Sequence, residues 1–339
     1  SLSIIMSVRP ATHAGSWYSS SPARLSSQLS NFLGNGAPVS GARIIVSPHA
    51  GYTYCGPTMG KAYASLDLSR VKRLFVLGPS HHVYFKNKAL VSNYAYVETP
   101  LGNLKVDHEV IHELLQMELV AETELVKHER KIFAKMDHET DQDEHSLEMQ
   151  FPMIYQTLMH RNISPEGISI VPIMISHNST KIDYLLGKTL EPFLRDAGNC
   201  FIVSSDFCHW GRRFNYTGYV GDRQDVADAM EENTEIEMLT LRSKLAHHQV
   251  PIHKSIEILD KFGMELLSRS EGDKYETWKE YLEVTGNTIC GEKPLGVLLC
   301  SLSYMGKGKS FHWCGYSQSS EVKSVMESSV SYGSGYCVL

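Results

Sequence analysis

Three histidines of this chain each follow closely on an apolar run that has the length of a buried strand. They are His49, His81 and His209, and Asp206 lies three positions before the last of them. In open parallel α/β sheets, ligands bind outside the carboxyl ends of the strands. Because crossover connections are right-handed, successive parallel strands present these ends at the same edge of the sheet. We therefore expect these four side chains to converge on one site.

Cys290 is the candidate that would complete this group. It stands just before a predicted helix that opens near Pro294, a residue favoured in the first helical turn. The dipole and free N–H groups of a helix N-terminus stabilise a thiolate, so we expect a lowered pKa for the Cys290 thiol. The alternative is a buried, inert cysteine. Cys300 in the same helix and Cys200 in a strand fit that alternative better.

Two imidazoles and one thiolate make a facial set for a divalent metal ion and leave positions open for water, oxygen or a substrate. Imidazole suits Zn, Cu and Fe, and a thiolate shifts the preference toward softer or borderline ions. The residues thus predict a mononuclear metal site held by His49, His81 and Cys290. Asp206 and His209 would then act as general acid/base groups or orient the ligands. Nucleophilic catalysis by Cys290 with His209 as its base is the alternative, and it leaves the first two histidines without a role.

Further aromatic and polar residues are candidates for the wall of a pocket. They lie in an N-terminal cluster, just after the first two histidines of the site, and at the start of a predicted helix; they are Trp17, His13, Tyr52, Tyr54, His82, His145 and Glu148. Exposed tryptophan and tyrosine often anchor ligands, and an aromatic wall beside polar groups is typical of a small-molecule or peptide site. A packed core and an ordinary helix start are the alternatives.

The elements that must position these residues indicate an α/β fold with a central, mostly parallel sheet flanked by helices. Near-continuous apolar runs predict strands buried on both faces at 42–47, 73–78, 168–175 and 200–204. Apolar periodicity predicts helices at about 21–32, 58–66, 107–115, 145–160, 181–195, 223–243, 251–268, 274–284 and 293–303. A run near 310–317 predicts a further edge strand.

The chain has no linker of proline, glycine and serine that would divide it, so we expect one domain over residues 7–339. Residues 1–6 are expected to be left from cloning or to form a disordered N-terminus. The charged stretches 118–143 and 221–243 are expected to be solvated surface, including the acidic segment 137–143.

Composition excludes several classes of protein. The chain has 339 residues, 42% of them hydrophobic, which is enough apolar surface to exclude dominant disorder. A net charge of -6 without a long basic run argues against nucleic acid as a partner. No apolar stretch approaches the roughly 20 residues of a transmembrane helix, so no membrane insertion is expected. The seven scattered cysteines are expected to be reduced thiols of a cytoplasmic protein.

Six motifs carry a resemblance to a known family. They are HAGSWY, PHAGYTYCG, LGPSHH, EHSLEMQFP, SSDFCHWG and NTICGEKPLG, and they contain or adjoin His13, His49, His81, His145, His209 and Cys290 in that order. Together they resemble the Memo family, mediators of ErbB-driven cell motility. The resemblance runs from His13 to Tyr332, and the sequence is particularly similar to fungal members.

This resemblance implies a fold like that of class III extradiol dioxygenases of the protocatechuate type. Those enzymes bind non-haem Fe(II) through two histidines and a glutamate. The histidine positions fall on His49 and His81, the acid/base histidine falls on His209, and Cys290 takes the place of the carboxylate. Because a thiolate is softer than a carboxylate and is oxidisable, extradiol ring cleavage does not follow from the resemblance.

For function, the resemblance implies a site for Fe(II) or Cu, with Zn as a further candidate, and a metal-dependent redox or metal-handling activity linked to cell motility or invasive growth. The alternative is a non-catalytic adaptor that binds phosphotyrosine peptides in the same pocket, with Trp17 among the contacts. Its partners would be receptor or cytoskeletal signalling proteins, and its location cytoplasmic or also nuclear. A cysteine hydrolase built on Cys290 is a third hypothesis.

Overall fold

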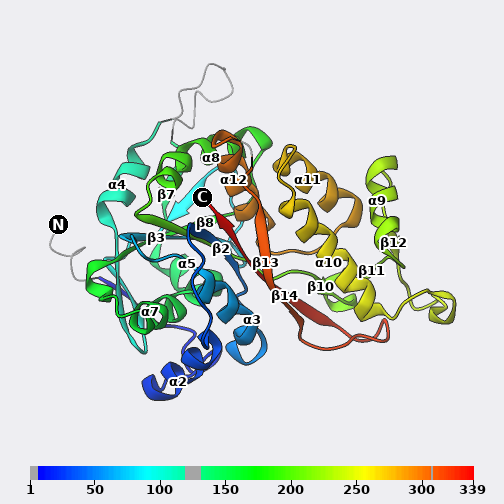
Figure 1. Ribbon diagram of the computed structural model, residues 1–339, viewed down its shortest axis with the longest axis horizontal. Coiled ribbons are helices and arrows are strands. Elements are labelled where there is room, and N and C mark those ends of the chain that lie inside the picture. Colours follow the sequence, from blue (N-terminus) through cyan, green and yellow to red (C-terminus); the bar gives the residue numbers. More distant parts are fainter. Residues whose placement is uncertain (1–6, 119–130, 307) are drawn as a thin grey trace.

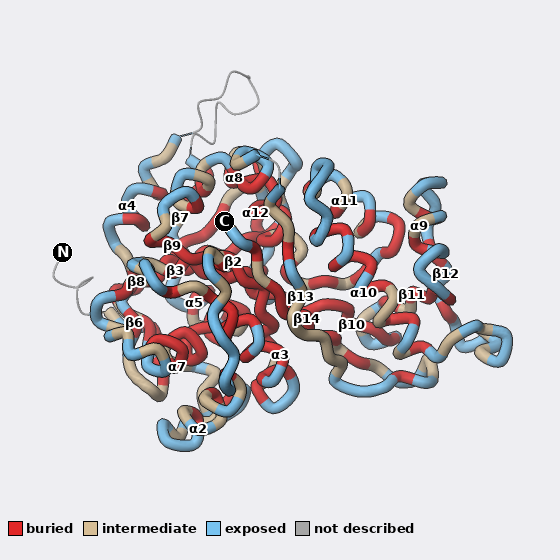
Figure 2. The backbone as a smooth tube through the Cα atoms, in the orientation of Figure 1, coloured by how far each residue is buried: buried red, intermediate tan, exposed pale blue. Residues whose placement is uncertain are grey.

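Four parallel strands form the centre of a large mixed sheet in the computed structural model, which describes residues 7–118, 131–306 and 308–339 (Figure 1). In spatial order they are β8 (Ser169–Ile175), β3 (Arg73–Pro79), β9 (Asn199–Ser204) and β2 (Ala42–Ser47). These are the four strands predicted from the apolar runs. Most of their residues are buried, because helices cover both faces of the sheet (Figure 2).

Antiparallel strands extend the sheet beyond β2. β14 (Ser329–Val338) pairs with β2, and β10 (His209–Trp210) and β13 (Phe311–Gln318) both pair with β14. β13 confirms the strand predicted near residues 310–317. β14 was not predicted, because its glycines and serines are untypical of strands; pairing with three neighbours determines its conformation instead.

Short strands complete the other edge of the sheet, and the sequence did not predict them. They are β1 (Val8–Arg9), β5 (Tyr96–Thr99), β6 (Gly102–Val106), β4 (Ala89–Val91) and β7 (Phe133–Lys135). A separate pair consists of β11 (Gly218–Tyr219) and β12 (Glu237–Met238).

The helices lie in layers on the two sides of the sheet and beyond β13 and β14. The described α-helices are α2 (Pro22–Leu33), α3 (Tyr52–Ser65), α4 (His108–Gln116), α5 (His138–Asp143), α6 (His145–Glu148), α7 (Phe151–His160), α8 (Thr180–Arg195), α9 (Arg223–Glu232), α10 (Ile252–Ser268), α11 (Lys274–Thr285) and α12 (Glu292–Tyr304). In Figure 1, α8 and α12 lie above the central strands, and α2, α3 and α7 lie below them. Helices α9, α10 and α11 pack together to the right of β13 and β14.

Two helix predictions near the site had wrong boundaries. α3 begins at Tyr52, six residues before the predicted start, and runs through Gly56 and Pro57. Gly56 serves close packing and not a turn, since a Cβ there would lie 2.1 Å from the ring of Phe32. The helix predicted at 145–160 is divided into α6 and α7, because Pro152 has no N–H to bond the preceding turn.

The charged stretches also differ from their predicted form. α9 was predicted to end near residue 243, but it ends at Glu232. The next residue, Asn233, takes a left-handed conformation with φ 53° and caps the helix. The segment 137–143 was predicted to be solvated, but Asp141 is buried. Its carboxylate accepts a hydrogen bond of 2.8 Å from Arg9, whose side chain is itself fully buried. Residues 119–130 of the same charged stretch lie outside the described residues.

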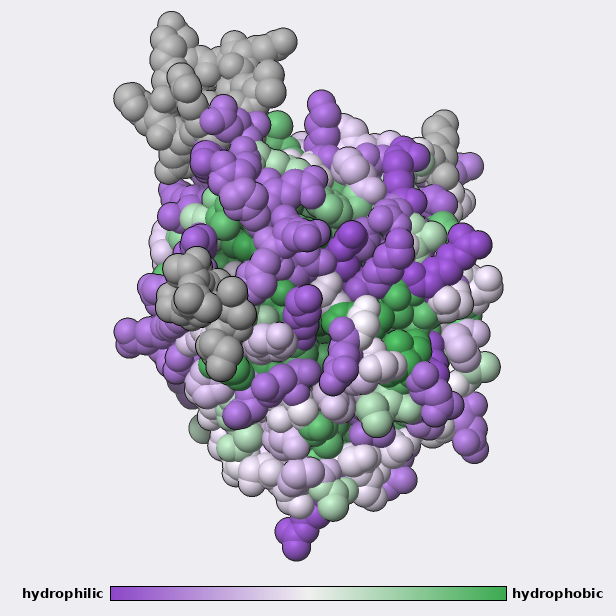
Figure 3. Space-filling model, turned by 90° about the vertical axis from the view of Figure 1, so that its left-hand side faces the viewer, coloured by the Kyte–Doolittle hydropathy of each residue, from purple (hydrophilic) through white to green (hydrophobic). Residues whose placement is uncertain are grey.

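The hydropathy of one face of the molecule agrees with a chain in which 21% of the residues are charged. The face on the left of Figure 1 carries hydrophilic residues over most of its area, with small hydrophobic areas between them (Figure 3). In the described part of the chain no helix is long and apolar enough to span a membrane. All seven cysteines are free, as predicted from their number and spacing.

Candidate metal centre

The carboxyl ends of the central strands lie at one edge of the sheet, and each delivers polar residues there. β2 leads to His49, β3 to His81, and β9 to Asp206 and then His209. Cys290 reaches the same edge from the loop before α12. Its neighbour Gly291 lies against the end of β9, where its N–H donates to the Ser205 hydroxyl at 2.9 Å and a Cβ would lie 2.2 Å from that of Ser205. The convergence predicted from the sequence is present.

His49 is the buried member of the group. Its Nε2 lies 3.1 Å from the Sγ of Cys290, and its Nδ1 lies 2.8 Å from the hydroxyl of Ser204. That hydroxyl donates its only proton to the carbonyl of Ser146 at 2.6 Å. Nδ1 of His49 must therefore be the donor to Ser204. The neutral imidazole then presents the lone pair of Nε2 toward Cys290.

His81 is oriented in the same manner by a carboxylate. Its Nδ1 lies 2.8 Å from Oε2 of Glu144, and its backbone N–H donates to the other oxygen of that carboxylate. A carboxylate only accepts, so Nδ1 carries the proton and Nε2 is free to bind a metal. Ligand atoms of His49, His81 and Cys290 all lie within 4.8 Å of one another. These three residues fit a divalent ion, since metal-binding histidines generally donate their second ring N–H in this manner.

Asp206 and His209 lie beside this group. The Nδ1 of His209 lies 3.0 Å from the carbonyl of Phe207 and 3.1 Å from that of Thr288, so it is protonated and leaves Nε2 free. Oδ1 of Asp206 accepts the backbone N–H of His49 at 2.9 Å, and Oδ2 lies 3.7 Å from Nε2 of His49. The loop that carries Cys290 thus also orients His209, through Thr288.

The electrostatics of the centre correct one prediction. Burial, followed by the nearby carboxylate of Asp206, raises the pKa of the Cys290 thiol well above its usual range. The expected lowering is wrong, because loss of solvation exceeds the effect of the hydrogen bond that the N–H of Asp206 donates to the sulfur. Burial and the neighbouring His81 lower the pKa of His49, which favours the neutral imidazole that a metal requires. Burial also raises the pKa of Asp206.

A wall of aromatic rings borders the histidines. His145 stacks on His81 with a centroid separation of 4.3 Å, and Trp17 stacks on His145, also at 4.3 Å. His13 and His82 meet His145 edge to face at 6.1 and 6.3 Å. Burial lowers the pKa of His145 to about 3, so this ring is neutral near pH 7. Trp17 remains 37% exposed and forms the outer part of the wall.

Of the other three predicted pocket residues, the structure brings only Glu148 to this wall, where its Oε1 lies 3.0 Å from Nδ1 of His13. Tyr52 is buried in the core, where its hydroxyl donates to the carbonyl of Met149 at 2.5 Å. Tyr54 points to the surface and is 65% exposed. Glu148 is fully buried, binds Arg9 at 2.5 Å and accepts from the backbone N–H of His13 at 2.8 Å. Glu148 therefore anchors the segment that carries His13.

A cavity of about 520 Å³ opens beside Cys290, and its lining contains residues that the sequence analysis missed. His81, His209 and Cys290 line it together with His177, Phe214 and Lys293, among others. His177 follows β8 just as His49 follows β2, so the rule that found the other histidines would have found it. Glu144, which orients His81, is the first residue of the motif EHSLEMQFP. No pattern in the sequence predicts that this carboxylate contacts His81.

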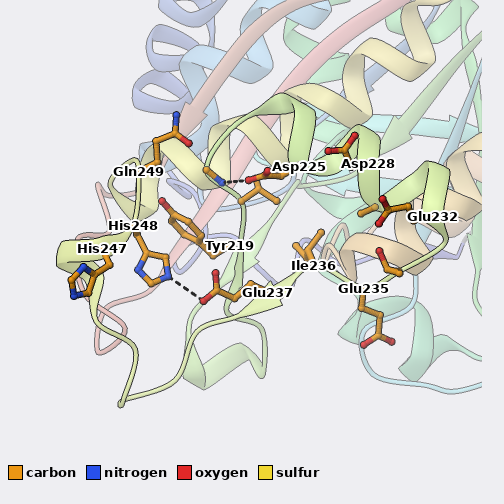
Figure 4. A pocket seen from close by; sticks show the side chains of 14 residues that line it. Tyr219, Asp225, Asp228, Glu232, Glu235, Ile236, Glu237, His247, His248 and Gln249 are labelled. Atoms are coloured by element: carbon orange, nitrogen blue, oxygen red, sulfur yellow. Dashed lines mark hydrogen bonds and ion pairs between the residues drawn. The ribbon is translucent and has the colours of Figure 1, made fainter.

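A second cavity, of about 450 Å³, lies beside α9 (Figure 4). Acidic side chains and two histidines line it, and some of these polar groups are paired with neighbouring residues. His248 binds Glu237 at 3.1 Å, and Asp225 accepts the backbone N–H of Gly221 at 2.8 Å. This cavity presents no convergent set of ligands comparable to that around Cys290.

Fold and site together define an α/β protein with a cluster of imidazole and thiol ligands at the carboxyl edge of its central sheet. Comparison with known proteins specifies the family. Residues 9–336 match the family described as Memo-like protein. The chain belongs to this Memo-like family, which confirms the resemblance found in the motifs.

Individual relatives support the same assignment over the full length. The chain is 55% identical to the MEMO1 family protein MHO1 of Saccharomyces cerevisiae, covering 98% of this chain and 100% of the relative. It is 37% identical to Protein MEMO1 of Xenopus laevis, covering 98% and 97%. Among solved structures, an uncharacterized protein of Escherichia coli is similar at 15% identity, covers 85% of this chain and 98% of its own, and has a TM-score of 0.37. That score is too low to establish a shared fold, so the likeness to extradiol dioxygenases stays a prediction.

Proposed function

We propose that this Memo-like protein binds a metal ion through His49, His81 and Cys290 and uses it in a redox or metal-handling reaction. The observation that carries the proposal is the arrangement of these ligands, whose atoms lie within 4.8 Å of one another. Both imidazoles hold their proton on Nδ1 and leave the lone pair of Nε2 for a metal ion. Fe(II) and Cu are the favoured ions, and Zn also suits this set of ligands.

The residues around the ligands support chemistry on a small molecule. When bound, the metal would supply Lewis acidity or an electron at an open coordination position. The cavity beside Cys290 is large enough for a small organic substrate. His209, with Nε2 free and its second nitrogen held by backbone carbonyls, would accept or donate a proton there. The proposed link to motility or invasive growth rests on the family alone.

The two alternatives have less support. Recognition of a phosphotyrosine peptide usually relies on arginine, and no arginine is among the described residues that line the cavity. A cysteine hydrolase needs an activated thiolate, whereas burial raises the pKa of Cys290. That reaction would also leave the paired orientation of His49 and His81 without purpose.

Elemental analysis tests the proposal. We expect protein purified anaerobically without added metal, or reloaded with Fe(II), Cu(I) or Zn(II), to hold bound metal. The double variant with His49→Ala and Cys290→Ala should lose it, and circular dichroism should show that the fold is retained. The variant Cys314→Ser, at a thiol outside the cluster, is the matched control and should keep its metal. Unchanged metal content in the double variant would contradict the proposal.

A further inference from the structure

Cys290 belongs to two sets of converging ligands and not only to one. Besides the group with His49 and His81, its Sγ lies within 4.8 Å of ligand atoms of Asp206 and His209, which are also within 4.8 Å of each other. The backbone N–H of Asp206 donates to the same sulfur at 3.3 Å. The sulfur is therefore shared by two adjoining groups of candidate ligands.

The histidine of the second group is oriented as a ligand. Both carbonyls near Nδ1 of His209 can only accept, which leaves Nε2 as the free nitrogen. Thr288 also accepts the backbone N–H of His209 at 2.8 Å and donates to its carbonyl at 2.7 Å. The position of His209 is thus determined at three points, which a surface histidine without a ligand would not require.

The carboxylate of the second group has an oxygen without a hydrogen bond. Asp206 is 4% exposed, and its Oδ1 accepts the N–H of His49. Oδ2 accepts no hydrogen bond from the described residues, and Nε2 of the neutral His49 lies 3.7 Å from it. Oδ2 is not one of the fully enclosed side-chain atoms that lack a partner, so it is in contact with open space, where it can bind a cation.

We propose that Asp206, His209 and Cys290 form a second cation position next to the first, with the sulfur of Cys290 as a bridge between two ions. The proposal rests on the metal site proposed above and extends it from a mononuclear to a binuclear centre. It suits borderline or soft ions such as Fe(II), Zn(II) or Cu(I), because the ligands are one imidazole, one thiolate and one carboxylate. A thiolate has lone pairs enough to bind two ions, and its charge offsets their mutual repulsion.

The ligand separations are compatible with metal bonds. With bonds of about 2.0–2.3 Å, the ligands of a tetrahedral ion lie about 3.3–3.8 Å apart. The 3.1 Å between His49 and Cys290 is close to this range, and the limit of 4.8 Å on both groups leaves only small adjustments. The rival arrangement is a single ion that takes Asp206 as a fourth ligand beside His49.

Titration with Zn(II), followed by native mass spectrometry and elemental analysis, separates these arrangements. We expect two ions per chain in the unaltered protein and one in each of the variants Asp206→Asn and His209→Gln. Asp206→Asn keeps the oxygen that accepts the N–H of His49, so the first site should stay intact. The matched control is His177→Gln, a histidine of the same cavity that belongs to neither group, and it should keep both ions. Thermal unfolding of each metal-free variant checks its fold.

Every other number of bound ions contradicts one or both of the two proposals. A single ion in the unaltered protein overturns the binuclear centre but leaves the proposed function intact, whereas no ion overturns both. If Asp206→Asn and His209→Gln still bind two ions, the second ion binds at another place, and this result also contradicts the proposed binuclear centre. With Co(II) as the probe, a bridging sulfur predicts loss of the electron paramagnetic resonance signal as the second equivalent binds, because the two spins couple.

Discussion

The Nε2 of His49 lies 3.1 Å from the Sγ of Cys290, although 241 positions separate the two residues in the chain. Strand β2 delivers the imidazole, and the loop before α12 delivers the sulfur. Each is oriented by groups that do not belong to either element, Ser204 for the imidazole and the N–H of Asp206 for the sulfur. A centre that is oriented in this way before any ion binds loses little entropy on binding.

If the proposed site binds metal, the thiol should determine which ions it prefers. The variant Cys290→Asp replaces it with a hard carboxylate and leaves both histidines in place. We expect its affinity for Cu(I) relative to that for Mn(II) to fall at least about tenfold, because softness of the ligand governs this selectivity. Competitive titration against chromophoric chelators measures both affinities. Cys290→Ser is the control and should weaken binding of both ions; an unchanged ratio in Cys290→Asp would mean that the sulfur is not a ligand.

Glu144 should contribute to metal affinity through His81. Burial alone would raise the pKa of this carboxylate, but the hydrogen bonds that it accepts from His81 and from the backbone N–H of Ser146 lower it to about 2, so it is ionised at neutral pH. Glu144→Gln keeps an acceptor for the imidazole but removes the charge. We expect metal affinity to fall about 10–100-fold. Glu139→Gln, at an exposed position of the neighbouring helix α5, should have no effect. Equal affinities in the two variants would show that the carboxylate does not tune the ligand.

Arg9 should stabilise the fold around helix α6, which carries His145 and the Glu148 that pairs with Arg9. Its guanidinium is fully buried and pairs with Asp141 at 2.8 Å and Glu148 at 2.5 Å. Arg9→Met would leave two buried carboxylates without their cation, which costs about 3–5 kcal/mol of unfolding free energy. Urea denaturation measures this loss. Arg223→Met removes an exposed pair with Glu265 and should change stability little, and a similar loss in both variants would contradict the prediction.

Asp260 should make stability depend on pH. It is fully buried between Cys208, Asn287 and Tyr316, and burial raises its pKa to about 6 from about 3.8. Between these two values the folded state binds one proton more than the unfolded state. Its contribution is therefore complete below pH 3.8 and is lost as the pH rises through 6.

The size of this effect follows from the pKa shift. One proton changes stability by about 1.4 kcal/mol per pH unit, so the shift amounts to about 3 kcal/mol. The variant Asp260→Asn lacks the pH dependence that Asp260 contributes. The contributions of all other titratable groups are the same in both proteins and cancel when their unfolding free energies are subtracted. The difference in unfolding free energy between the unaltered protein and the variant should therefore fall as the pH rises from 4 to 6. Urea denaturation of the metal-free proteins at several pH values checks this, and a constant difference would mean that Asp260 is ionised throughout.

Local patterns in the sequence predicted the central strands and the residues beyond them. Continuous apolar runs identify β2, β3, β8 and β9 because strands buried on both faces must be apolar throughout. Histidines after three of these strands then predicted the site. His177 follows β8 in the same way, so the pattern of a histidine just after a buried strand also predicts that residue. The break before Pro152 and the end of α9 at Asn233 also have local causes that a closer analysis of the sequence would have found.

Other features depend on contacts that no local pattern contains. β14 is a strand because β2, β10 and β13 pair with it, despite its glycines and serines. Asp141 belongs to an acidic segment that is typical of surface, yet Arg9, 132 positions away, binds it in the interior. Glu144 orients His81 across a gap of 63 positions.

The amino-acid sequence by itself determined the family, the central strands and the candidate ligands, because motifs and apolar runs are local properties of a chain. Tertiary structure alone decided the charge and orientation of those ligands. The pKa of the Cys290 thiol is the clearest example: its place before α12 predicted a lowered value, and burial raised it instead. Solvation and the direction of a lone pair depend on everything that surrounds an atom, and residues distant in the sequence supply most of those surroundings.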